Sequence, residues 1–195
     1  NSYFCQMKKN LAILILTLSF AGYSQTPGVE KSIFSIQTGF AGLWINNEIK
    51  LSSSTVLRSE LGLEHDFTVG DHYDNTGFIL QPVITIEPRW YYNLNKRFTA
   101  KRKTAHNSGN FIALKTNYHP DWFVLNMDSP KKKIADLSIV PTWGIKRQIG
   151  THFTYETGLG LGYRIVYLKQ NDPIEGNTNQ SQYVPYFHLR LGYLF

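Results

Sequence analysis

The chain has 195 residues, a formal net charge of +6, 42% hydrophobic residues, 14% aromatic residues and a single cysteine. This length suits one domain or one small barrel of short strands, and nothing in the composition points to a second domain. Because that cysteine, Cys5, precedes the expected start of the mature chain, we expect no disulfide, thiol nucleophile or cysteine-ligated metal.

Residues 7–25 have the pattern of a secretory signal peptide. Lys8 and Lys9 form a basic start, residues 11–20 are apolar, and small residues follow at 22–24. The apolar run is about half of the ~20 residues that a spanning helix needs, so a retained anchor helix is the weaker alternative. We therefore assign residues 1–24 to upstream residues plus a signal peptide, and 25–195 to a single β-barrel domain.

After the leader, apolar and polar residues alternate with the period of a β-strand. The first such segment is 33–49, whose facing is ambiguous, and 56–64, 78–92, 112–119 and 137–146 follow. The clearest segments are 153–167 and 183–195. In each, one face is apolar with aromatics near its ends, and the other is small, polar or charged. Prolines at 82 and 88 each remove a ladder donor from their strand.

These segments number seven, whereas a single-chain bacterial barrel has an even number of strands. The missing strand is most easily found in 31–51, if the chain folds back on itself near Gly39 to Gly42. We therefore predict an all-β fold: an antiparallel up-and-down transmembrane β-barrel of eight strands. The polar stretches 66–76, 126–133 and 170–182 should then lie at one end, and 147–150 and the basic loop 93–108 at the other.

If the apolar faces meet lipid, the opposite faces fill the interior of the barrel. An eight-stranded barrel is just wide enough for side chains to fill it, so charges there should pair and close it. A proton path or gate is the alternative. The predicted ion-pair network of the lumen comprises Arg58, Glu60, Glu64, Glu87, Arg89, Lys115, Lys146, Glu156, Arg164, His188 and Arg190.

Aromatic residues recur near the ends of the predicted strands, as in the interface girdles of membrane barrels. The expected girdle comprises Trp90, Tyr91, Tyr92, Trp122, Trp143, Tyr163, Tyr167, Tyr193 and Phe195. Basic clusters at 96–103 and 131–133 could meet lipid phosphates or another anionic polymer, or could be solvated loop charges. Nucleic acid is not an expected partner of an exported chain.

Candidate catalytic groups are confined to the expected rim. His65, Asp66, Asp71, His72, His119 and Asp121, with Ser129 or Ser138, could bind a divalent cation or act on outer-leaflet lipid. Their spacing matches no metal or triad motif, and the P-loop, Rossmann, HExxH and GxSxG patterns are absent from the sequence. We therefore assign no catalytic residue, metal or cofactor.

The chain resembles the small outer-membrane β-barrel proteins of Bacteroidetes type and is broadly similar to the eight-stranded OmpA and OmpX barrels. The resemblance rests on the leader, on residues 87–97, on 119–122 and on the terminal segment 191–195. It implies export to the outer membrane, lipid as a partner, and recognition by a barrel-assembly machinery. The implied assembly signal is Phe187, Leu189, Leu191, Tyr193 and Phe195.

We expect a structural, adhesion or surface-interaction role with a closed polar lumen. The alternatives are a lipid-modifying enzyme using His119 or His72 at the rim, a narrow transporter of a small solute, and a soluble β-barrel that binds lipid. The sequence does not determine the oligomeric state.

Overall fold

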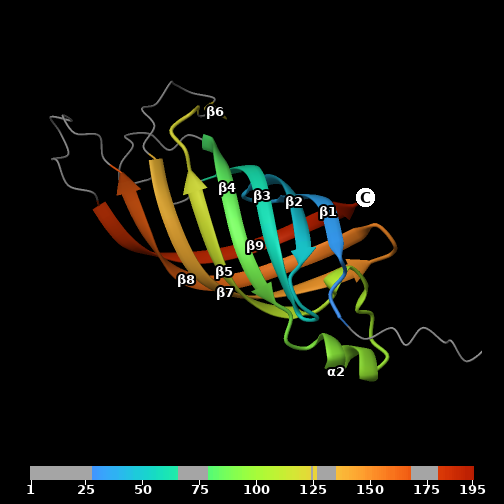
Figure 1. Cartoon of the computed structure of the whole chain (residues 1–195). Helices are drawn as coiled ribbons and strands as arrows, with labels where there is room; N and C mark the ends of the chain where they lie inside the picture. Colours follow the sequence, from blue (N-terminus) through green and yellow to red (C-terminus); the bar gives the residue numbers. More distant parts are fainter. Residues whose placement is uncertain (1–27, 66–78, 124, 127–134, 168–179) are drawn as a thin grey trace, which may run out of the picture.

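The structure is a computed structural model that describes residues 28–65, 79–123, 125–126, 135–167 and 180–195. In these residues the chain forms one antiparallel sheet that closes on itself as an eight-stranded β-barrel (Figure 1). The predicted all-β fold, an antiparallel up-and-down barrel of eight strands, is therefore confirmed. Residues 1–24, assigned to the leader, lie outside the described residues.

Each strand of the barrel pairs with the next along the chain when β5 and β6 are counted as one. The strands are β1 (Ser32–Gly39), β2 (Gly42–Lys50), β3 (Thr55–His65), β4 (Ile79–Trp90), β5 (Asn110–His119), β6 (Leu125–Asn126), β7 (Ala135–Ile149), β8 (Phe153–Tyr167) and β9 (Gln180–Leu194). The two-residue β6 pairs with the start of β4, and β5 pairs with the rest of it, so β5 and β6 together make one strand of the barrel.

The strand that completes the even count lies where the sequence placed it. β1 and β2 form a tight hairpin in which Gly39 is paired with Gly42. The barrel closes between β1 and β9, with Ser35 opposite Leu194 and Gly39 opposite Arg190. Closure leaves neither the first nor the last strand with an unpaired edge.

Prolines interrupt the ladder locally without ending the strands. Pairing of β4 with β5 stops at Ile86–Thr116 and resumes in the same register at Arg89–Ala113, on the far side of Pro88. Because proline has no backbone N–H, it removes a ladder bond where it stands. Pro88 still occupies its place in the β3–β4 ladder, opposite Leu57.

The two ends of the barrel differ. Helix α2 (Leu94–Thr99) and the 3₁₀ turn η2 (Ala105–Asn107) connect β4 to β5 at the end where β9 finishes. Figure 1 shows α2 beyond this end of the strands, which we call the plugged end. The short β7–β8 turn also lies there and contains Gly150, whose φ of 62° favours glycine. The β1–β2 turn lies at the opposite end, which we call the cavity end.

The strands have opposite characters on their two faces. Buried positions in the strands include arginine, lysine, glutamate, asparagine and serine, whereas large apolar side chains are exposed on the same strands. This is the reverse of a water-soluble fold, which buries its apolar side chains.

Candidate functional site

The outward-facing residues form an apolar wall around the barrel. Leu61, Leu159 and Leu161 are 56–64% exposed, and every barrel strand contributes. The large side chains of this outer wall include Phe34, Leu43, Ile45, Leu61, Ile86, Trp90, Ile112, Leu114, Ile139, Trp143, Leu159, Leu161, Phe187, Leu189 and Leu191. Such a continuous exposed apolar surface marks contact with lipid or with another protein.

The interior contains a cluster of charged side chains at the middle of the barrel. This central ionic cluster comprises the cations Arg58, Arg89, Lys115, Lys146 and Arg190 and the carboxylates Glu48, Glu60, Glu87 and Glu156, each at most 2% exposed. Charges this deeply buried are tolerated only when they are paired and hydrogen-bonded.

Glu48 receives donors on both carboxylate oxygens. Its Oε1 lies 2.8 Å from Lys146 Nζ, 3.4 Å from Arg58 Nη1 and 3.5 Å from Arg89 Nη1. Its Oε2 accepts hydrogen bonds from Asn107 Nδ2 at 2.8 Å and from the Tyr91 hydroxyl at 3.2 Å. Three cations therefore share this one carboxylate.

Glu156 and Glu60 bring residues of β5, β8 and β9 into the same cluster. Arg89 binds Glu156 with two hydrogen bonds, Nη2 to Oε1 at 2.7 Å and Nη1 to Oε2 at 2.9 Å, and Arg58 Nη1 lies 3.0 Å from Oε2. Glu60 accepts from Arg190 Nη1 at 2.6 Å and from Arg58 Nη2 at 3.0 Å, and Lys115 Nζ lies 3.4 Å away. Two-point arginine–carboxylate contacts fix geometry as well as charge.

Aromatic rings also contact the buried cations. The Arg190 guanidinium lies 3.7 Å from the centre of the Trp44 ring, and the Arg89 guanidinium lies 4.2 Å from that of Phe111. Lys115 Nζ is 4.9 Å from the Tyr186 ring. Cation–π contacts of this kind stabilise a desolvated cation.

An apolar cluster fills the plugged end below the ionic cluster. It consists of Val29, Val56, Tyr91, Leu94, Phe111 and Ala113. The Tyr91 hydroxyl joins it to Glu48. Burial, and then the nearby Glu48 charge, raise the pKa of Tyr91 well above its usual value, so the hydroxyl remains a neutral donor. The interior is therefore filled by apolar packing at this end and by ion pairs in the middle.

The prediction of Tyr91 as a girdle residue is wrong, because its side chain is 1% exposed. Trp90 and Tyr92 face outward, so the intervening side chain must face inward.

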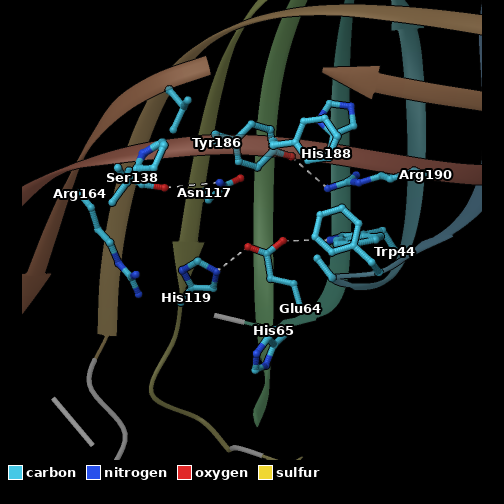
Figure 2. A pocket seen from close by; sticks show the side chains of 16 residues that line it. Trp44, Glu64, His65, Asn117, His119, Ser138, Arg164, Tyr186, His188 and Arg190 are labelled. Atoms are coloured by element: carbon cyan, nitrogen blue, oxygen red, sulfur yellow. Dashed lines mark hydrogen bonds and ion pairs between the residues drawn. The ribbon is translucent and has the colours of Figure 1, made fainter. Parts of the chain in front are cut away.

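At the cavity end, a line of hydrogen bonds joins residues from five strands, β2, β3, β5, β7 and β8. Glu64 accepts a hydrogen bond from Trp44 Nε1 at 3.2 Å, and its other oxygen lies 3.0 Å from His119 Nε2 (Figure 2). His119 Nδ1 lies 2.9 Å from Asp136, whose second oxygen accepts from Arg164 Nη2 at 2.6 Å. With a carboxylate at each ring nitrogen, both nitrogens act as donors, as in a protonated imidazole. We call these five residues the rim chain.

Trp44, Glu64, His119 and Arg164 of the rim chain line a cavity of about 360 Å³ that ends above the ionic cluster. Asn117, Ser138 and Tyr186 line it together with Trp44 and Arg190, as Figure 2 shows. Asn117 Nδ2 donates to Ser138 Oγ at 3.4 Å, and Arg190 donates to the Tyr186 hydroxyl at 3.4 Å. The polar groups of the cavity are therefore largely bonded to one another.

All eleven residues assigned to the lumen from the sequence face inward, but they fall into two groups. Glu64 and Arg164 belong to the rim chain, and His188 Nε2 lies 3.2 Å from Glu156 at the edge of the central ionic cluster. Glu87 contacts Arg89, at 2.9 Å. Glu87 and the other seven all belong to the central ionic cluster.

Five of the predicted girdle aromatics and all five assembly residues lie on the outer wall. Trp90, Tyr92, Trp143, Tyr163 and Tyr167 are 39–51% exposed. The terminal residues Phe187, Leu189, Leu191, Tyr193 and Phe195 are 42–73% exposed. The Phe195 ring lies 5.5 Å from that of Phe34 across the β1–β9 closure.

The rim candidates do not form a catalytic group in the described residues. His119 contacts carboxylates on both sides, and within the described ranges no serine hydroxyl hydrogen-bonds to it. No group of three or more His, Cys, Asp or Glu residues in those ranges could hold a metal ion. Asp66, Asp71, His72 and Ser129 lie outside the described residues.

Sequence reasoning missed Glu48 and Asp136, each of which receives at least two polar contacts. It also missed Trp44, Asn46 and Gln37, which are 1–2% exposed. The signal was present for Glu48: with the turn at Gly39–Gly42, even-numbered positions of β2 face inward. Trp44 hides this alternation in the sequence, because it is an apolar residue on the inward face of β2, where the other residues are polar.

No family model, curated protein sequence or solved structure matches the chain. In the described part of the chain, no helix is both long and apolar enough to cross a membrane.

Proposed function

We propose that this chain is an outer-membrane β-barrel that spans the membrane with its eight strands, has a sealed polar lumen, and serves a structural, adhesion or surface-interaction role. The observation that carries the proposal is the inverted arrangement of the barrel, with leucine and aromatic side chains outside and paired arginine and glutamate inside. Lipid is the solvent in which an apolar outer wall has the lower free energy.

The same inversion argues against a soluble barrel that binds lipid. Such a barrel needs an apolar interior to hold acyl chains, whereas this interior contains nine buried charged side chains in the central ionic cluster alone. A narrow transporter is disfavoured because Arg58, Arg89 and Glu156 cross the middle of the barrel in direct contact.

A lipid-modifying enzyme also has less support, because both ring nitrogens of His119 are engaged by carboxylates. Replacing His119 or His72 by Ala, followed by analysis of lipid A acyl composition, tests this alternative. We expect no change in either variant.

The proposal includes export by the signal peptide and assembly by a barrel-assembly machinery that reads the last strand. The support is the exposed alternating face of β9 from Phe187 to Tyr193, followed by the exposed Phe195, together with the resemblance of the sequence to OmpA-type and OmpX-type barrels.

Fractionation followed by gel electrophoresis with and without heating tests the proposal. A folded membrane barrel resists dodecyl sulfate until it is heated, so we expect the protein in the outer-membrane fraction and a mobility that changes on boiling. In planar bilayers we expect no conductance steps. Recovery in the soluble periplasm with unchanged mobility would overturn the proposal.

A further inference from the structure

A strongly basic hollow lies on the outside of the barrel at the plugged end. It has a volume of about 610 Å³. Helix α2 bounds it on one side, and Asn110 at the start of β5 and Arg147 near the end of β7 bound it on the other. Its basic lining residues are Lys96, Arg97, Arg102 and Arg147, which we call the basic pocket. Tyr92 and Asn110 complete the wall against the barrel.

The charges of the basic pocket are not balanced in the way the interior charges are. In the described part of the chain, no carboxylate forms an ion pair with any of its four cations. Arg97 instead donates to the carbonyl of Lys103, at 2.9 Å from Nη2. Arg147 donates to the carbonyl of Lys146 at 2.7 Å and to the Asn110 side chain. These neutral acceptors orient both guanidinium groups without neutralising them.

The crowding of like charges is unfavourable in the absence of an anion. Partial burial, and then the neighbouring Arg102, lower the pKa of Arg97 below its usual value. An anion that enters the hollow removes this repulsion. Arginines that present several N–H groups around one space are suited to phosphate, which accepts paired hydrogen bonds.

The position of the hollow identifies the kind of phosphate. Strand alternation places Arg147 and Asn110 on the outer wall, in the same rows as Ile145, Trp143 and Ile112. The Tyr92 hydroxyl accepts hydrogen bonds from Trp143 Nε1 at 2.9 Å and from Asn110 Nδ2 at 3.3 Å. Amphipathic aromatics of this kind lie at the level of lipid headgroups. The basic pocket therefore begins where the apolar wall ends.

We propose that the basic pocket binds the phosphate of an anionic phospholipid, whose acyl chains lie along the outer wall beside Trp143 and Ile112. The shared chemistry is a phosphate group, so a free phosphate is the competing source. The apolar wall distinguishes the two, because only a lipid occupies both surfaces. This inference rests on the proposed membrane location of the barrel.

The test uses the full mature chain, refolded in a non-ionic detergent and checked by its heat-dependent gel mobility. Short-chain phosphatidylglycerol, short-chain phosphatidylcholine and inorganic phosphate are titrated separately by calorimetry. We compare Arg97→Gln/Arg102→Gln with Lys101→Gln/Lys103→Gln. The second pair removes the same charge from the same segment at side chains that do not line the hollow.

We expect phosphatidylglycerol to bind more tightly than either comparison ligand. Loss of two charge-assisted hydrogen bonds should weaken its binding at least ~10-fold in the arginine variant. The lysine variant should change by less than ~3-fold, because surface charges there act through screened solvent.

Three results would overturn the inference: equal binding of inorganic phosphate and phosphatidylglycerol, equal binding of both lipids, or equal weakening in both variants. Failure of the proposed function is separately visible. A chain that binds phosphatidylglycerol in detergent but stays out of the membrane fraction contradicts the location. A normal membrane barrel without lipid preference contradicts only the pocket.

Discussion

Glu48 provides the most demanding test of the buried ion pairs. The central ionic cluster contains five cations and four carboxylates, so it carries an excess of one positive charge. The substitution Glu48→Gln raises that excess to two and leaves Lys146, Arg58 and Arg89 without their shared carboxylate. The amide keeps the size of the side chain but places an NH₂ donor among cations.

The expected cost is large because the site is fully buried. Removing one partner of a buried ion pair typically destabilises a protein by about 3–5 kcal/mol, since the remaining charge is left uncompensated. A second substitution, Lys146→Met, returns the excess to one positive charge. The double variant Glu48→Gln/Lys146→Met should therefore recover part of the lost free energy of unfolding.

Urea unfolding of the refolded barrel in lipid vesicles, followed by tryptophan fluorescence, measures these differences. Glu30→Gln is the matched control, because Glu30 is 39% exposed and contacts only His106 among the ion pairs of the described residues. We expect this control to change stability by less than ~1 kcal/mol. A Glu48→Gln variant as stable as the control, with no recovery in the double variant, would refute the reasoning.

Three further changes test other parts of the barrel. Gly144→Ala would place its Cβ 2.3 Å from Phe111 Cζ, so we expect a loss of about 1–3 kcal/mol by urea unfolding, largely relieved by adding Phe111→Leu. Phe195→Ala should slow assembly in cells while leaving the heat-dependent gel shift intact, and unchanged membrane levels in a pulse-chase experiment would contradict it. His119→Gln leaves Glu64 and Asp136 without their shared partner, and we expect the free energy of unfolding to fall by about 1–3 kcal/mol. Stability equal to that of the native chain would argue against a charged rim chain.

The sequence predicts the facing of most strands, because strand alternation is a local property. Residues 153–167 and 183–195 have the predicted inward and outward faces, and the fold-back at Gly39–Gly42 is confirmed. Tyr91 shows that an aromatic residue near a strand end does not always belong to the interface girdle. Its neighbours Trp90 and Tyr92 belong to the outer wall, and strand alternation places the residue between them inside.

The pairing inside the barrel could not be predicted in this way. Arg58 meets Glu156 across 98 positions of sequence, and their height in the barrel depends on strand stagger, which alternation does not specify. Glu48 is the clearest case: its inward facing follows from the hairpin and Arg58 is its register partner on β3, but its contacts with Arg89 and Lys146 join strands that β2 does not pair with. The basic pocket likewise depends on where α2 lies relative to β7.

Quenching of tryptophan fluorescence by lipids with brominated acyl chains tests the orientation of the strands most directly. Three variants that each retain one tryptophan, Trp44, Trp90 or Trp143, are refolded into such vesicles. We predict strong quenching of Trp90 and Trp143, which are 51% and 40% exposed on the outer wall, and weak quenching of Trp44, which is 1% exposed inside the barrel. Quenching of Trp44 as strong as that of the other two, or no quenching of any of them, would contradict a barrel with lipid outside and ion pairs inside.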